Sequence, residues 1–344
     1  MISSIIEEVH SRAIELKDER IKTVYFGGGT PSILNALELH QILNTIRNNY
    51  KIDENVEITL EANPDDINSD ILNTWRQQGI NRLSIGVQSF RPNDLEWMNR
   101  SHTAEQSVNA VKLAQEQGFH NITIDLIYGL PNMSIKEWEA QLDQAIILNI
   151  PHISAYCLTV EPNTELAHLT KSGKIVTPGD HIQSEEFLML RRKLLEAGFV
   201  QYEVSNFGKE GFQSQHNSAY WKNEKYLGIG PSAHSFDGVS RRWNVSNNQR
   251  YMSTIETNGD YFYLEILRPI DKFNELLLTG LRTIYGVDKT MLLKEVTPPT
   301  SFEEQINKYK LKGWLVEEHQ KYLLTTDGLL FADRIASELF LVED

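Results

Sequence analysis

The sequence predicts an α/β fold in which parallel strands are covered by helices. Three observations support this class: strand-type and helix-type segments alternate over the first two hundred residues, glycine follows several of the helices, and polar residues recur near the ends of successive strands. This alternation is typical of parallel strands joined by crossover helices. The pattern leaves two architectures open, a (β/α) barrel and a doubly wound sheet.

The predicted elements follow in order from the N-terminus. Apolar residues at helical spacing predict a helix over 5–16 and another around 39–46, with Asn35 and Glu38 as its N-cap pair. Further helices are predicted over 69–78, 104–117, 134–148 and 181–197, and glycine directly follows three of them. Short apolar or alternating runs predict strands over 23–26, 56–61, 82–88, 121–128, 152–159 and 200–205.

The composition is that of an acidic globular protein. The 344 residues include 33 Lys and Arg and 47 Asp and Glu, so the formal net charge is −14, which argues against a nucleic-acid partner. No apolar run approaches the roughly 18–20 residues that span a bilayer. The first residues are acidic where a secretory signal would be basic, so we expect a cytoplasmic protein. The single cysteine, Cys157, can build neither an intramolecular disulfide nor a cysteine-ligated metal site within one chain.

Residue parity within the strands indicates where a ligand would bind. In each of three predicted strands the alternate apolar residues form one face, and the other face carries a polar residue near the carboxyl end: Glu61, Gln88 and Asp125. The carboxyl ends of parallel strands are where barrel and open-sheet enzymes place their ligands. We therefore expect these three side chains to share a polar site.

A glycine-rich stretch, VYFGGGTPSIL, follows the first predicted strand and borders the same end of the sheet. Three glycines in succession allow the backbone to approach a ligand closely. The stretch is not a P-loop, because no GK[ST] follows, and it does not fit GxGxxG, because Ser32 replaces the third glycine. A ligand with polar ends and no large phosphate group fits this loop better.

Several motifs together resemble one protein family. They are YFGGGTPSIL, LEANPDD, RLSIGVQSF, MNRSH around Arg100, IDLIYGLP, LTVEPNT and, further on, QHNSAYWKNEKYLGIGPSAHSF. This series is similar to the radical S-adenosylmethionine (SAM) proteins related to oxygen-independent coproporphyrinogen III oxidase, and the last segment is most similar to the HemW-type haem chaperones of that group. The resemblance implies a radical SAM (β/α) barrel that lacks its first strand, followed by an α+β, winged-helix-like domain.

The resemblance also implies which residues hold SAM. The glycine-rich loop would contact the methionyl amino end, and charged or polar side chains would hold the remaining polar groups. The implied residues are Gly28, Gly29, Thr30, Glu61, Gln88, Arg100 and Asp125, with Thr159 as a weaker match. The chemistry agrees, because carboxylates accept from ammonium and hydroxyl groups and an arginine can bind the carboxylate of SAM.

The sequence departs from the family in one respect. Radical SAM proteins bind a [4Fe–4S] cluster with a CxxxCxxC motif after the first strand, and no such motif occurs in these residues. We expect an in-frame segment with this motif upstream of Met1; the alternative is a relative that has lost the cluster. Without the cluster, SAM is expected to bind weakly, and the edge of strand 23–26 is expected to be solvated or paired with another chain.

The second half is expected to form the family's C-terminal domain. Strand–helix alternation stops near Phe207, which gives predicted domains of 1–206 and 207–344. Aromatic residues accumulate there, and His216 and His234 are candidate haem ligands. A helix over 302–312, a hairpin in GWLVEEHQKYLLT and a helix from about 327 to 340 predict the winged-helix-like module.

Two functions stay open at this stage. The first is a haem chaperone that delivers haem to acceptor proteins, and the alternative is an oxygen-independent coproporphyrinogen III oxidase of porphyrin biosynthesis. The segment YLGIGPSAHSF favours the chaperone. No catalytic residue and no metal ligand is assigned, and the sequence specifies no oligomeric state.

Overall fold

The computed structural model describes residues 1–342, which form two compact units. One unit comprises residues 25–33 and 58–213, and we call it the barrel unit. The other comprises residues 1–24, 34–57 and 214–344, and we call it the terminal unit. The domain boundary after residue 206, which was predicted from the end of strand–helix alternation, stays a prediction.

The largest sheet is built from strands in nearly sequential order. Its strands are β1 (Arg20–Phe26), β2 (Lys51–Ala62), β3 (Arg82–Gln88), β4 (Asn121–Tyr128), β5 (His152–Cys157), β6 (Val200–Glu203) and β7 (Asn206–Gly208). All of them except most of β1 and the first half of β2 belong to the barrel unit. Their order is β1-β2-β3-β4-β5-β7-β6, and the pairs from β2 to β5 are parallel. A doubly wound sheet would reverse its strand order part-way, so this curved sheet is of the barrel type. β1 lies at one edge, as expected.

The strand predicted over 200–205 is shorter in the structure, and a further strand follows it that was not predicted. β6 ends at Glu203, residues 204 and 205 form a turn, and β7 then pairs antiparallel with both β6 and β5. The turn between β6 and β7 contains no glycine and is held by Glu203, whose carboxylate accepts from the Ser205 N–H and the Asn206 amide. The sequence pattern did not predict this turn, because the Glu203 side chain holds it and no typical turn-forming residue pair marks it.

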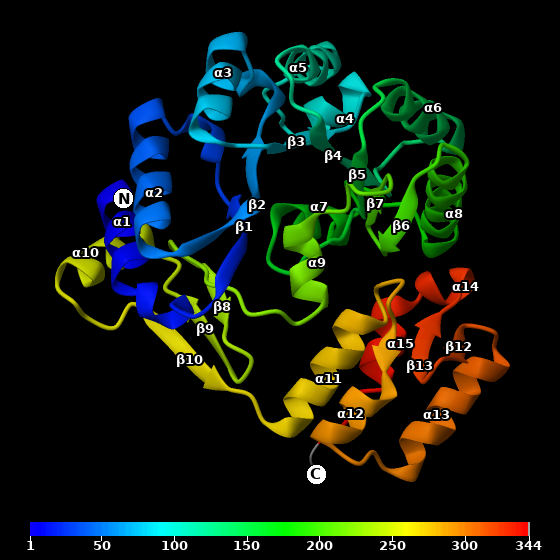
Figure 1. Ribbon diagram of the computed structural model, residues 1–344. Coiled ribbons are helices and arrows are strands. Elements are labelled where there is room, and N and C mark those ends of the chain that lie inside the picture. Colours follow the sequence, from blue (N-terminus) through cyan, green and yellow to red (C-terminus); the bar gives the residue numbers. More distant parts are fainter. Residues whose placement is uncertain (343–344) are drawn as a thin grey trace. The chain divides into compact units, whose positions relative to one another are not determined.

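Helices α3 (Ser69–Gln78), α5 (Ala104–Glu116), α6 (Ile135–Ile147) and α8 (Asp180–Glu196) lie on the outer side of the curved sheet (Figure 1), each within a few residues of its predicted range. The unit also contains the short helices α4 (Pro92–Trp97) and α7 (Glu165–Lys171). Apolar side chains such as Leu83, Ile85 and Val87 are fully buried. Ser84, of the opposite parity in β3, instead contacts Asp125 of β4, which agrees with the predicted parity.

The terminal unit begins with α1 (Ile2–Ser11), which is shorter than the predicted helix over 5–16 and is followed by a 3₁₀ turn. Next comes α2 (Ala36–Asn49), in which Asn35 and Glu38 form the expected capping box. A three-stranded antiparallel sheet has the order β10 (Phe262–Ile266), β9 (Ser240–Asn244) and β8 (His234–Phe236). The helices α9 (Gln215–Trp221) and α10 (Asn248–Glu256) belong to the same unit.

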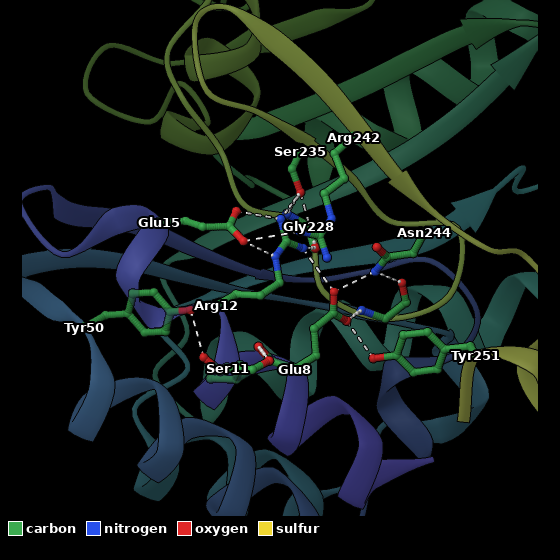
Figure 2. A network of polar contacts seen from close by, with 12 residues as sticks. Glu8, Ser11, Arg12, Glu15, Tyr50, Gly228, Ser235, Arg242, Asn244 and Tyr251 are labelled. Atoms are coloured by element: carbon green, nitrogen blue, oxygen red, sulfur yellow. Dashed lines mark hydrogen bonds and ion pairs between the residues drawn. The ribbon is translucent and has the colours of Figure 1, made fainter. Parts of the chain in front are cut away.

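A buried polar network joins α1 to the loop before β8 (Figure 2). Glu8 accepts hydrogen bonds from Arg12 Nη1 at 3.0 Å, the Gly230 N–H at 2.8 Å, Asn244 Nδ2 at 2.8 Å and Tyr251 OH at 2.6 Å. Arg12 in turn donates to the Gly228 carbonyl at 2.8 Å. These contacts connect the C-terminal end of α1 to this distant loop.

The last part of the terminal unit has its own core. It contains α11 (Pro269–Gly280), α12 (Lys289–Glu295), α13 (Thr300–Leu311), α14 (Thr326–Leu329) and α15 (Ala332–Glu338), with a sheet of β11 (Val287–Asp288), β13 (Lys321–Leu324) and β12 (Leu315–Glu318). The predicted final helix is divided into α14 and α15. Gly328 of α14 packs directly against the Trp314 backbone, and a Cβ at this position would lie 2.0 Å from the Trp314 carbonyl oxygen. This contact with a distant residue holds α14 in place just before the division.

None of the helices in the described part of the chain has both the length and the apolar character that a bilayer crossing needs.

Candidate functional site

The site lies at the carboxyl ends of β2, β3 and β4 in the barrel unit. Glu61 is paired in register with Ser84 of β3, and Asp125 of β4 is paired with Ser154 of β5. Because the strands are parallel, these residues stand at the same end of the sheet. The structure therefore brings the predicted carboxylates Glu61 and Asp125 onto neighbouring parts of the barrel interior.

Glu61 joins the strand end to the glycine-rich loop. Its Oε1 accepts from Tyr25 OH at 2.7 Å, and its Oε2 accepts from the Gly28 N–H at 3.2 Å. A Cβ added to Gly27 would lie 2.7 Å from Glu61 Oε1, so the loop can approach the carboxylate only because position 27 is glycine. The predicted association of Glu61 with the loop is thus present.

The loop itself leaves its backbone open. Gly28 and Gly29 have φ values of +79° and +68°, in the left-handed region that favours glycine. Nothing lies within 4 Å of a Cβ built at either position, and Thr30 is exposed. A ligand can therefore approach the backbone of residues 28–30 directly.

Asp125 has few hydrogen-bond donors for a carboxylate in the barrel interior. Ser84 Oγ donates to its Oδ2 at 3.4 Å. Burial, with the neighbouring charge of Glu61 as the next cause, raises the pKa of Asp125 to about 7, while Arg82 and the serines oppose the shift. The side chain is therefore close to its titration point at neutral pH and has hydrogen-bonding capacity to offer a ligand.

Gln88 and Arg100 both approach Gly86. A Cβ added to Gly86 would be 3.0 Å from Gln88 Nε2 and 3.5 Å from Arg100 Nη2. Arg100 Nη2 donates to Asn63 Oδ1 at 2.8 Å, whereas its Nε is buried with no hydrogen-bond partner among residues 1–342. Gln88 has a φ of +65°, which is uncommon for a side-chain-bearing residue. These two predicted residues therefore form a second group around the end of β3.

Thr159 is not brought into either group by any hydrogen bond. It lies just beyond β5, it is exposed, and its hydroxyl donates to the Cys157 carbonyl at 3.4 Å. Its predicted role in the site stays a prediction.

The sequence pattern missed three residues that support the site. Tyr25 binds Glu61, Asn63 binds Arg100, and buried His102 donates from Nε2 to the Val87 carbonyl at 3.1 Å, next to Gln88. Strand parity could have indicated Tyr25. It lies two positions before Gly27, so its side chain is on the same face of the strand as the start of the loop. Asn63 and His102 lie within LEANPDD and MNRSH, although neither was assigned a role.

A second polar layer lies beneath the carboxylates. Arg82 donates to Thr123 Oγ1, which is 3.0 Å from His152 Nδ1, and His152 Nε2 is 2.8 Å from Tyr202 OH. Burial, with the Arg82 charge as a smaller cause, holds the pKa of His152 well below its usual value, so the imidazole is neutral. This layer fixes the inner faces of β3, β4, β5 and β6 below the site.

The two candidate haem-ligating histidines lie in the terminal unit and differ in surroundings. His216 Nδ1 is 2.9 Å from Thr23 Oγ1, and its Nε2 is 3.2 Å from Tyr220 OH. His234 is exposed on β8 and stacks on Trp243, which in turn stacks on Tyr263. The first imidazole is oriented by hydrogen bonds, and the second forms one end of an aromatic row.

Comparisons with known proteins agree with this architecture. A family model described as the radical SAM superfamily matches residues 2–145. The heme chaperone HemW of Bacillus subtilis is 31% identical over 338 residues, which are 97% of this chain and 89% of that protein. The heme chaperone HemW of Escherichia coli is 33% identical over 355 aligned residues, covering 99% of this chain and 90% of that protein.

One solved structure shares the fold over nearly the whole chain. The coproporphyrinogen III oxidase HemN of Escherichia coli, a radical SAM enzyme, superposes with a TM-score of 0.82 at 21% identity. The match covers 98% of this chain and 82% of that one. The expected radical SAM-type barrel with an additional domain of helices and sheets is thereby confirmed as the fold.

Proposed function

This chain belongs to the HemW group of the radical SAM superfamily, and from that premise we propose that it binds haem and delivers it to acceptor proteins. The relatives named as heme chaperones match nearly its full length at 31% and 33% identity. The structural observation that supports haem binding is an oriented imidazole, His216, beside the partly exposed ring of Tyr220.

His216 is the stronger of the two candidate ligands. Histidines that bind metals commonly hold their second ring nitrogen against an oxygen, which fixes the tautomer and the ring direction. Thr23 Oγ1, 2.9 Å from His216 Nδ1, provides such an oxygen and leaves Nε2 to face the iron once Tyr220 OH moves aside. Haem in turn offers a flat apolar face for aromatic rings such as that of Tyr220.

His234 stays the second candidate. Its ring nitrogens make no hydrogen bond among residues 1–342, and its ring is exposed beside Trp243. It is accessible, although no neighbouring oxygen orients it. Ligation by His234 would place haem against the aromatic row of the three-stranded sheet.

The test is a haem titration followed through the Soret band. We expect the wild type to bind haem, and His216→Ala to weaken binding at least tenfold and shift the band. The exposed histidine variant His120→Ala serves as the matched control and should leave the titration unchanged. If His234→Ala weakens haem binding and His216→Ala does not, the haem ligand is His234 on β8. A wild type that does not bind haem would refute the proposed function.

The strand-end site fits SAM by its chemistry. Glu61 and Asp125 can accept from an ammonium group or ribose hydroxyls, and the unpartnered Nε of Arg100 is a buried donor available to a carboxylate. The open backbone of Gly28, Gly29 and Thr30 leaves room for a ligand beside Glu61, and Gln88 offers an amide next to Arg100. We assign SAM binding, not a reaction, to these residues.

The residues present do not fit an iron–sulfur cluster. Such a cluster requires several thiolates, and this sequence contains one cysteine, Cys157. Burial raises the pKa of the Cys157 thiol to about 11, so it is protonated at neutral pH. SAM and a [4Fe–4S] cluster are expectations of the family, and we assign no step through the cluster to these residues.

SAM binding is tested by calorimetric titration. We expect weak binding by the wild type and at least a tenfold further loss in Arg100→Ala, because the buried donor is removed. The exposed Arg192→Ala is the control. Equal affinities for the wild type and the Arg100 variant would show that Arg100 does not contact the ligand.

The alternative function, oxygen-independent coproporphyrinogen III oxidation, is supported only by the fold shared with HemN. Incubation with coproporphyrinogen III, SAM and a reductant distinguishes the two functions, since formation of vinyl groups would identify an oxidase. The cytoplasmic location stays a prediction.

A further inference from the structure

Ser32 holds the far end of the glycine-rich loop. It occupies the position where GxGxxG would carry its third glycine, and it lies in the short 3₁₀ turn Pro31–Ile33 that follows the loop. The residue is buried, and its Oγ donates to Asp66 Oδ2 at 2.5 Å. Such a short distance is typical of a hydroxyl bound to an ionised carboxylate, one of the stronger kinds of hydrogen bond in proteins. The loop is therefore tied to Asp66 two positions after Thr30.

The same oxygen of Asp66 also binds the residue that holds Arg100. Asn63 Nδ2 donates to Asp66 Oδ2 at 3.4 Å, and Asn63 Oδ1 accepts from Arg100 Nη2 at 2.8 Å. In the opposite orientation, the amide would turn its donor group toward the guanidinium and its oxygen toward the carboxylate, so both contacts would be unfavourable. Asp66 and Arg100 together therefore fix the direction of the Asn63 amide.

The backbone gives Asp66 a defined position. Asp66 ends the 3₁₀ turn Pro64–Asp66, which begins with a buried proline. Its N–H donates to the Asn63 carbonyl at 3.1 Å, and the turn packs against β3 and α5. Because proline has a nearly fixed φ, such a turn has few alternative conformations. A carboxylate on this turn can hold the loop and Arg100 at a constant separation.

We propose that Asp66 is a positioning residue of the strand-end site, where it holds the glycine-rich loop and Arg100 in place for SAM without contacting the ligand. Glu61, five positions earlier, binds the near end of the loop through the Gly28 N–H. Residues 61–66 therefore hold both ends of the loop as well as the guanidinium. A site held in its binding conformation loses less entropy when the ligand binds. The inference rests on the SAM binding proposed above.

Two substitutions of Asp66 distinguish positioning from direct contact, with SAM affinity measured by calorimetric titration. Asp66→Ala removes the acceptor that Ser32 and Asn63 share, so we expect SAM affinity to fall about tenfold or more. Asp66→Asn keeps an oxygen that can accept both hydrogen bonds and should stay within about threefold of the wild type. If the carboxylate instead bound the ammonium group of SAM, both variants would lose affinity, because the amide carries no charge.

Amide hydrogen exchange of the free protein gives a readout that does not require SAM. Followed by mass spectrometry, peptides covering residues 27–33 should exchange faster in Asp66→Ala than in the wild type, and at the wild-type rate in Asp66→Asn. Ser32→Ala should also exchange faster, because it breaks the same contact from the other side. The exposed Asp70→Ala on α3 is the matched control and should change neither measurement. Unchanged far-ultraviolet circular dichroism shows that each variant is folded.

The outcomes separate this inference from the function on which it rests. SAM binding by the wild type with an unchanged affinity or unchanged loop exchange in Asp66→Ala would overturn the inference alone. Equal losses of affinity in Asp66→Ala and Asp66→Asn would make Asp66 a ligand-binding residue and would also overturn it. A wild type that binds no SAM would refute the SAM assignment and, with it, a positioning role toward that ligand.

Discussion

Two carboxylates, the buried Glu8 in the terminal unit and the partly buried Asp125 in the barrel unit, are surrounded very differently. Glu8 accepts from four donors at 2.6 to 3.0 Å, one of them the buried guanidinium of Arg12. Asp125 has the Ser84 hydroxyl at 3.4 Å and the repelling charge of Glu61 nearby. Both residues are acids, but only one is fully satisfied by its own chain.

The difference distinguishes a structural carboxylate from one available for binding. A carboxylate whose oxygens are all occupied stabilises the fold and has little capacity left for a ligand. A carboxylate with few donors weakens the free protein and gains most when a ligand supplies the missing donors. The same reasoning applies to Glu61, which binds the Tyr25 hydroxyl and the Gly28 N–H and lies beside the open loop.

The largest effect is expected from Glu8→Ala. It leaves Arg12 buried without its partner and removes the acceptor for Gly230, Asn244 and Tyr251, so we expect the free energy of unfolding to fall by about 3–5 kcal/mol. Urea unfolding followed by circular dichroism measures this. Glu7→Ala, one position earlier and exposed, should change it by less than about 0.5 kcal/mol. Similar values for both variants would mean that the network does not stabilise the unit.

The next effect is a pH dependence at Asp125. Its folded pKa of about 7 lies above the value of about 3.9 expected for the unfolded chain, so the folded state holds the proton more tightly. The stability from this group is therefore complete below about pH 4 and is lost as the pH rises through about 7. Relative to Asp125→Asn, which does not titrate, the wild type should lose roughly 3 kcal/mol between pH 4 and pH 7.

Urea unfolding at several pH values measures the difference between the wild type and Asp125→Asn. The exposed Asp18→Asn is the control and should follow the wild type at every pH. If the difference in unfolding free energy between the wild type and Asp125→Asn stays constant from pH 4 to pH 8, then ionisation of Asp125 does not destabilise the folded state.

The smallest effects come from one substitution made at both sites. Tyr251→Phe removes a hydroxyl from the closed network of Glu8 and should cost about 2 kcal/mol, as expected for a buried hydrogen bond to a charge. Tyr25→Phe removes a hydroxyl from Glu61 at the open site and should cost less than about 1 kcal/mol, since water or the loop can replace it. Thermal unfolding of both variants measures the two losses of stability. Equal losses would show that the Glu8 network and the Glu61 site do not differ in this way.

Local sequence patterns predicted the barrel and much of the site. Strand parity has a period of two, so the inward positions of Glu61 and Asp125 could be inferred from their own strands. The capping box of Asn35 and Glu38 is local in the same way. The haem-ligand and SAM assignments came from the family resemblance, and they stay proposals.

The features that the sequence did not reveal depend on distant or unusual contacts. Three of the four partners of Glu8 lie 222 to 243 residues away along the chain, beyond the reach of any periodicity. The turn between β6 and β7 is made by the Glu203 side chain instead of a glycine. The hydrogen bond between Ser32 and Asp66 also required the structure, because it joins two loops that are 34 residues apart in the sequence.

The separation between Glu8 and its partners has a consequence for synthesis. At about 5–20 residues per second, the ribosome needs roughly 10–50 seconds to make the 243 residues between Glu8 and Tyr251. During that time α1, a helix of 10 residues, is too short to be stable alone, whereas most of the barrel unit can fold from its own continuous segment 58–213. We expect protease to cleave residues 1–24 in ribosome-bound chains that stop before residue 228 and to spare them in chains released at full length. Residues 1–24 are thus made before the barrel segment 58–213 but complete their folding after it.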